Sequence, residues 1–209
     1  MRLRHISLIL LLPLLLSACD ENWNWRQKVT VTVATPAGER VGETVLAGRL
    51  RRAGGPLPPE ARGAFLSVRG EAVVVEVAPG RYLFALLHGM PTAFPVFFPG
   101  KAPVKMASRL DGLREIREVP PELYPLMVTF DDMADPKSVR RVDPANLAAS
   151  FGPGVALTSM TMGITDEDVT EGRVEAVLGW VWDQTYRTNP IWASLPSLSQ
   201  ETISGLVKG

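Results

Sequence analysis

The chain has 209 residues, of which 46% are apolar, and its 22 basic and 22 acidic side chains give no formal net charge. A chain of this length and composition can bury a sizeable core as one domain, and its charge balance argues against a nucleic-acid partner. It contains one cysteine and two histidines. A disulfide framework, or a zinc site built from thiolates or from three histidines, therefore cannot form within one chain.

The N-terminus has the pattern of a secretory signal. Two arginines precede an apolar run over residues 6–16, which is too short to cross a bilayer as a helix, and Leu16-Ser17-Ala18-Cys19 follows. This segment resembles the signal peptide and lipobox of bacterial lipoproteins. The resemblance implies that residues 1–18 are cleaved and that Cys19 carries acyl chains such as palmitate, which hold the mature protein on a membrane.

The residues after Cys19 indicate where the anchored protein lies. Asp20 resembles the retention signal of enteric lipoproteins, and it favours the periplasm-facing inner membrane of the cell envelope over the outer membrane. We expect residues 19–26 to form a lipidated tether, in which Trp23 and Trp25 either rest at the headgroup level or cap the first strand. No polybasic run adjoins the anchor, so the sequence predicts attachment by lipid and not by charge.

The first half of the mature chain has the alternation of β-strands. Valines and threonines alternate over residues 29–33, and residues 41–50 resume extended character after a Pro-Ala-Gly turn, which predicts a hairpin. Residues 72–77 and 82–87 flank a Pro-Gly turn and predict a second, buried hairpin. A short strand is expected near residues 65–68.

Residues 90–125 are rich in proline, which predicts a long ordered loop because proline lacks a backbone N–H donor. Within this loop Phe94, Phe97 and Phe98 bring three aromatic rings close together. The cluster has two interpretations. It is either an exposed surface that binds an envelope partner, or part of a loop that folds back over the sheet and closes the core.

Helices are expected in the second half. A strand over residues 126–130 precedes two Asp-Pro pairs, which are typical helix starts, and residues 144–151 predict a short helix. Residues 155–164 return to extended form. Thr170 is expected to cap a last helix, whose buried stripe runs from residue 174 to residue 181.

Strands that precede helices predict an α+β fold, a mainly antiparallel sheet with one or two helices on one face. We expect a single domain over residues 27–190 and a loosely packed or frayed tail over residues 191–209.

Few residues suggest catalysis. After cleavage of the signal His88 is the only histidine, and no Gly-x-Ser-x-Gly motif accompanies it, so a strand-end histidine bonded to a backbone carbonyl is favoured over a catalytic triad. Asp131, Asp132 and Asp135 follow a strand, with Asp143 nearby. These carboxylates indicate either a structural turn network or a metal site, and the metal site would support a hydrolase.

Aromatic residues near the C-terminus either stack on sugar rings of a glycan or pack against the sheet; they are Trp180, Trp182, Tyr186 and Trp192. In the absence of a catalytic motif, the sequence favours a non-catalytic binding or assembly module of the envelope, with no cofactor and with a membrane and an envelope protein as its partners. The alternatives are a metal-dependent hydrolase and a glycan- or peptidoglycan-binding domain. Residues 135–144 and 151–154 resemble bacterial proteins of unknown function, a resemblance that implies no activity.

Overall fold

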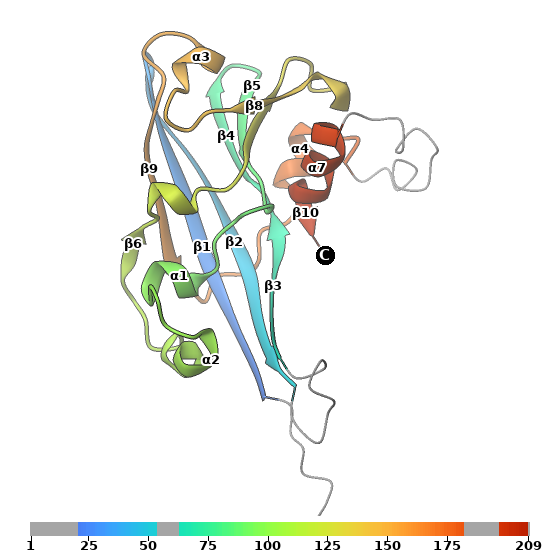
Figure 1. Cartoon of the computed structure of the whole chain (residues 1–209). Coiled ribbons are helices and arrows are strands. Elements are labelled where there is room, and N and C mark those ends of the chain that lie inside the picture. The colour runs from blue at the N-terminus through green and yellow to red at the C-terminus, as the bar shows by residue number, and fades with distance from the viewer. Residues whose placement is uncertain (1–20, 54–62, 182–196, 209) are drawn as a thin grey trace, which may run out of the picture.

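The computed structural model describes residues 21–53, 63–181 and 197–208. They form the α+β fold that the sequence predicted, although with two antiparallel sheets instead of one (Figure 1). The large sheet has six strands and the small sheet has four. Within the described ranges, no helix has the length and apolar character needed to cross a membrane.

A long hairpin forms the centre of the large sheet. Its strands β1 (Glu21–Thr35) and β2 (Gly38–Arg52) pair along their whole length. Successive residues of a strand point to opposite faces, so Val29, Val31 and Val33 all enter the core, where they are fully buried. The predicted first hairpin is therefore confirmed, and it is longer than the alternating pattern alone indicated.

The predicted tether over residues 19–26 is wrong for its described part, because β1 already begins at Glu21. Pairing with β2 and burial of an aromatic ring stabilise these residues as a strand. Trp25 is only 6% exposed, and its ring packs edge to face on Phe94 with the centroids 5.1 Å apart. Trp23 is half-buried against the same core.

The remaining strands of the large sheet flank this hairpin in the order β10-β3-β2-β1-β9-β6. The strand expected near residues 65–68 is confirmed as part of β3. β9 pairs with β1 only from Gln27 onward, so it leaves the edge of residues 21–25 without a strand partner. The flanking strands are β3 (Ala64–Glu71), β6 (Ile116–Glu118), β9 (Ala156–Ile164) and β10 (Val207–Lys208).

The small sheet contains the predicted second hairpin and the predicted strand near residue 128. Only Ala72 separates β3 from β4, so the chain passes directly from the large sheet to the small one at this residue. The strand order is β4-β5-β7-β8. The strands are β4 (Val73–Ala78), β5 (Arg81–Ala85), β7 (Met127–Phe130) and β8 (Val139–Val142).

Both faces of β4, β5 and β7 are covered, which explains why these strands are mostly apolar. On the inner face, Val75 and Leu83 belong to the same buried cluster as Val31 of the large sheet. On the outer face, Phe84 and Val128 share a cluster with apolar residues of two helices. These helices are α4 (Arg173–Val177) and α7 (Ser197–Leu206), and their position confirms the expectation of helices on one face (Figure 1).

The prediction of a frayed C-terminal tail is wrong where the tail is described. Ile203 and Leu206 of α7 are buried, at 4% and 0% exposure. The carbonyl of Gly205 accepts a hydrogen bond from the N–H of Leu87 at 2.7 Å, and that of Leu206 accepts one from Ala72 at 2.8 Å. Burial and main-chain bonding together hold the end of the chain on the small sheet.

The proline-rich segment over residues 90–125 is an irregular, ordered layer that lies beside the lower part of the large sheet (Figure 1). Prolines stand at the start of two of its turns, where no N–H donor is needed. Its short helices are α1 (Ala93–Phe97), α2 (Pro103–Met106), η3 (Ala107–Arg109) and η4 (Pro121–Leu123).

The two Asp-Pro pairs give shorter helices than the sequence predicted. Asp135 caps η5 (Pro136–Ser138) by accepting the N–H of Lys137 at 2.8 Å. Asp143 instead accepts the N–H of Ala145 at 2.9 Å and forms a turn. The predicted helix over residues 144–151 is therefore reduced to α3 (Ala148–Phe151).

Candidate functional site

A segment that we call the crossing segment, residues 165–172, runs from the end of β9 to β2 over the outer face of the large sheet. At its start, Thr165 donates its N–H to the carbonyl of Arg26 at 3.1 Å. At its far end, Thr170 donates its N–H to the carbonyl of Val45 at 3.0 Å and accepts the Val45 N–H on its hydroxyl at 2.9 Å. Thr170 therefore ties the segment to β2 and is not the predicted helix cap.

Ion pairs hold the middle of the crossing segment on β1. Lys28 Nζ lies 3.1 Å from a carboxylate oxygen of Glu167 and 3.2 Å from one of Glu43. Arg26 pairs with Asp168 at 2.9 Å. Hydrogen bonds to Glu167 and then Glu43 raise the pKa of Lys28, and the hydrogen bond from Lys28 lowers the pKa of Glu167.

We expect Lys28→Met to lower the melting temperature only within a pH window. Because the pKa of Lys28 in the folded protein is above its ordinary value of 10.5, the ion pairs of Lys28 contribute their full stabilisation below pH 10.5. This stabilisation is lost as pH rises through the pKa of Lys28 in the folded protein. Because the pKa of Glu167 in the folded protein is below its ordinary value of 4.5, its pairing with Lys28 contributes its full stabilisation above pH 4.5. This stabilisation is lost as pH falls through the pKa of Glu167 in the folded protein. The difference in melting temperature between the native chain and the variant should thus be largest between these limits. A difference that does not change with pH would contradict this account.

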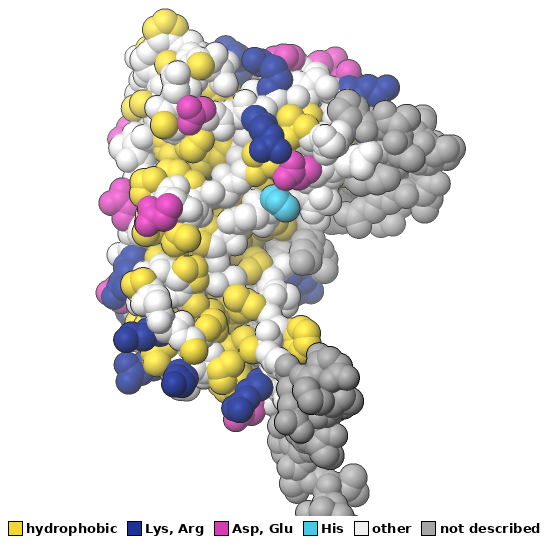
Figure 2. Space-filling view, viewed as in Figure 1, with side chains coloured by type: hydrophobic (Ala, Val, Ile, Leu, Met, Phe, Trp, Pro, Cys, Tyr) yellow, Lys and Arg dark blue, Asp and Glu magenta, His cyan; other side chains and the backbone are white. Residues whose placement is uncertain are grey.

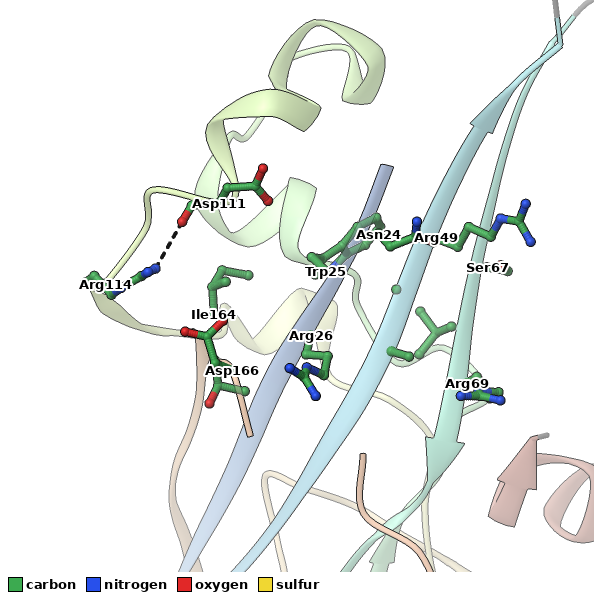
Figure 3. Close-up of a pocket in the computed structure, with 14 residues that line it drawn as sticks. Asn24, Trp25, Arg26, Arg49, Ser67, Arg69, Asp111, Arg114, Ile164 and Asp166 are labelled. Carbon is green, nitrogen blue, oxygen red and sulfur yellow. Dashed lines mark hydrogen bonds between the residues drawn. The ribbon is translucent and has the colours of Figure 1, made fainter. Parts of the chain in front are cut away.

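Beside the crossing segment, the outer face of the large sheet and the open edge of β1 border a cavity of about 810 Å³ (Figure 3). We call it the arginine groove, because arginines from three strands and one loop line it. The loop after η3 forms the opposite wall, and the crossing segment forms part of the rim. Its charged lining residues are Arg26, Arg49, Arg69, Arg114, Asp111 and Asp166.

The charged lining is positive, because four arginines face two aspartates. Three of the guanidinium groups are oriented by neighbours. Arg26 pairs with Asp168, and Arg49 donates to the side-chain oxygen of Asn22 at 3.1 Å. Arg114 donates to the main-chain carbonyls of residues 111 and 113 at 3.1 and 2.8 Å. These bonds leave other N–H groups of each guanidinium available for a ligand.

Trp25 lines the groove, and its ring is fixed in the core beneath it. Its ring lies against Gly48, where any side chain would overlap it, so the position requires glycine. Trp25 donates its indole N–H to Gln27 at 3.0 Å. The fully buried amide of Gln27 in turn accepts the N–H of Ala93 at 2.9 Å and donates to the carbonyl of Pro91 at 2.8 Å.

The interpretation of the phenylalanine cluster as an exposed docking surface is wrong. Phe94 and Phe97 are only 2% and 3% exposed, and Phe98 is half-buried against the same core. Arg117 covers the ring of Phe97, with its guanidinium carbon 5.4 Å from the centroid. Three adjacent rings are accommodated because α1 turns two of them inward. The alternative interpretation, a loop that closes the core, is confirmed.

The carboxylates after β7 form the turn network that was one of their two interpretations. Asp131 pairs with Arg140 at 2.5 Å, Asp132 accepts the N–H of Ala134 at 2.9 Å, and Asp135 caps η5. Across the described residues, no three His, Cys, Asp or Glu side chains gather closely enough to hold a metal ion. Asp131, Asp132 and Asp135 therefore all have partners within the turn network.

His88 and Trp180 are also placed by the structure. His88 lies in a turn after β5, and its Nε2 is 3.3 Å from a carboxylate oxygen of Glu201, so its side-chain partner is not the backbone carbonyl that the sequence suggested. Trp180 donates to the carbonyl of Met133 at 2.7 Å and packs on Phe130, as expected for packing against the sheet. The other aromatic residues of this group, Trp182, Tyr186 and Trp192, lie outside the described residues, as does Cys19.

The sequence did not reveal the arginine groove. Its arginines are far apart in the chain and become neighbours only through strand register, which places Ala47 opposite both Arg26 and Arg69. Strand alternation could have shown that Arg49 and Arg51 share the outer face of β2. No pattern in the sequence connects Arg114 to that face.

Comparison of the chain with protein-family models, with curated proteins and with solved structures finds no match, so its function has to be inferred from the residues described above.

Proposed function

We propose that the chain is a lipid-anchored protein of the bacterial cell envelope that acts as a non-catalytic binding module, and that the arginine groove binds its ligand. The anchoring rests on Leu16-Ser17-Ala18-Cys19, which resembles a lipobox. The observation that carries the binding role is that Arg26, Arg49, Arg69 and Arg114 all line one cavity.

The chemistry of the groove favours an anionic ligand. A guanidinium presents a planar fork of N–H donors that matches the two oxygens of a carboxylate or phosphate. Arg69 is exposed and has no hydrogen bond or ion pair within the described part of the chain, so it is free to meet a ligand. Trp25 also lines the groove, although its ring packs inward on Phe94.

A binding role fits this groove better than catalysis does. No histidine lines it, and the only hydroxyl groups of its lining belong to Ser67 and Thr165. The hydroxyl of Thr165 already bonds to the Glu167 carboxylate at 3.3 Å. Ser67 has no adjacent base in the lining to activate it, as nucleophilic catalysis by serine requires.

The test is titration of the purified protein with citrate and with pyrophosphate, two multivalent probes of carboxylate and phosphate chemistry. We expect saturable binding by calorimetry, and Arg69→Gln/Arg114→Gln should weaken it at least tenfold, because each lost charge-assisted hydrogen bond is worth about 1.5–3 kcal/mol. Arg40→Gln/Lys137→Gln is the matched control, since it also removes two positive charges and both residues are exposed outside the groove lining. Equal binding by the double variant and the control would contradict the assignment of the groove.

A further inference from the structure

The chain enters the domain at one end of the large sheet. β1 begins there with Glu21, which is opposite Arg52 of β2, and β3 begins there opposite the same Arg52 (Figure 1). Cys19 precedes Glu21 by two residues, and two residues span at most about 7 Å. If Cys19 is lipidated, this end of the molecule is the end nearest the bilayer.

Basic side chains gather at this end, although they are dispersed in the sequence. Arg51 and Arg52 close β2, while α2 and the following turns lie beside the same end of the hairpin, where α2 contacts β2. Figure 2 shows Lys and Arg side chains around the lower end of the molecule with apolar groups between them. The exposed basic residues, here called the anchor-side surface, are Arg51, Arg52, Lys101, Lys105 and Arg109.

Three of these basic residues have no acidic partner in the described segments that form the end. Glu21 pairs with Arg52 at 3.0 Å, and Asp111 faces the arginine groove. Lys101, Lys105 and Arg109 are exposed, and none has a side-chain hydrogen bond or ion pair with another described residue. The sequence has no polybasic run beside the anchor, and on that ground we expected charge to play no part in attachment. The anchor-side surface could not be recognised in this way, because its residues are separated in the chain and become neighbours only in the fold.

Apolar side chains accompany the basic ones. Phe65 and Leu66 lie at the start of β3, opposite Arg51 and Leu50, and they remain 59% and 41% exposed. Exposed aromatic and aliphatic residues beside basic ones are typical of proteins that rest on a membrane, where the rings lie at headgroup level and the cations near lipid phosphates.

We propose that the anchor-side surface rests on the anionic headgroups of the bilayer in which the lipid is inserted. This proposal rests on the proposed lipid anchor and extends it, because it gives the domain a defined orientation. Each basic residue close to an anionic bilayer raises binding about fivefold. The occupant is a lipid surface and not a protein, because the covalent anchor itself would keep that surface within reach.

The experiment measures hydrogen exchange of the full-length protein purified from cell membranes and reconstituted into vesicles. Phosphatidylcholine vesicles with and without phosphatidylglycerol are compared. We expect the amides of residues 101–110 and 64–66 to exchange more slowly only with phosphatidylglycerol. Lys101→Glu/Lys105→Glu should lose this protection, whereas Arg40→Glu/Lys137→Glu, which changes the net charge equally at exposed sites elsewhere, should keep it.

Equal protection in both kinds of vesicle, or protection confined to other segments, would overturn the proposal. The mass of the N-terminal fragment, read in the same experiment, reports the lipid on Cys19 independently. If the protein is lipidated but shows no protection, the proposed role of the anchor-side surface is wrong and the proposed lipid anchor stands. If the protein is not lipidated but shows the protection, the proposed lipid anchor is wrong and the contact of the anchor-side surface with anionic lipid stands.

Discussion

Glu71→Ala is expected to lower the free energy of unfolding by about 3 kcal/mol, because it would leave one buried and two partly buried N–H groups without their acceptor. The Glu71 side chain is 1% exposed at the end of β3. Its carboxylate accepts the backbone N–H groups of Gly172, Arg173 and Val174, the last two at 2.9 and 3.1 Å. This single side chain therefore joins the large sheet, the end of the crossing segment and α4.

Urea unfolding checks this prediction. Glu71→Gln retains one acceptor oxygen and should lie between the native chain and Glu71→Ala. Glu39 is exposed near the hairpin turn, so Glu39→Ala should change the stability by about 0.5 kcal/mol or less. A loss for Glu71→Ala as small as that for Glu39→Ala would show that the carboxylate does not cap α4.

Gln27→Leu is expected to cost about 3 kcal/mol, although leucine is apolar and close in size. The Gln27 amide satisfies the indole N–H of Trp25, the N–H of Ala93 and the carbonyl of Pro91. Each buried polar group left without a partner costs about 1–3 kcal/mol. The variant should also speed the exchange of the Ala93 amide, because that hydrogen bond holds α1 against β1.

Thr30→Val is the matched control for this second prediction, since Thr30 lies on the same strand with its side chain on the opposite, outer face. Its effect on unfolding should stay within about 0.5 kcal/mol. If Gln27→Leu is as stable as Thr30→Val and the Ala93 amide exchanges as in the native chain, the buried network does not support the groove wall.

The fold was predictable where local patterns determine it. Alternating valines place β1, and a turn dipeptide between two apolar runs places the β4–β5 hairpin, because side-chain period and turn chemistry are local properties. The helices were less predictable. α4 begins where Glu71, about a hundred residues earlier in the chain, accepts its N–H groups, and no nearby residue signals that contact.

The candidate site was not predictable for a related reason. Phe94 and Phe97 attracted attention as apolar residues in a proline-rich loop, yet α1 turns them into the core. Arg26, Arg69 and Arg114 are unremarkable in sequence, and only the pairing of β1, β2 and β3 brings the first two onto one face. Sequence patterns describe single elements, whereas this groove is a property of register between them.

Photo-crosslinking in intact cells tests the central claim most directly. A photoreactive amino acid replaces Ser67 in the arginine groove or, as a control, the exposed Pro79 in the β4–β5 turn. The account predicts a discrete product from position 67 alone, which is lost with Arg69→Gln/Arg114→Gln and with Cys19→Ala. The same products from both positions, or a product from position 67 that is unaffected by these substitutions, would contradict a lipid-anchored binding module that acts through the arginine groove.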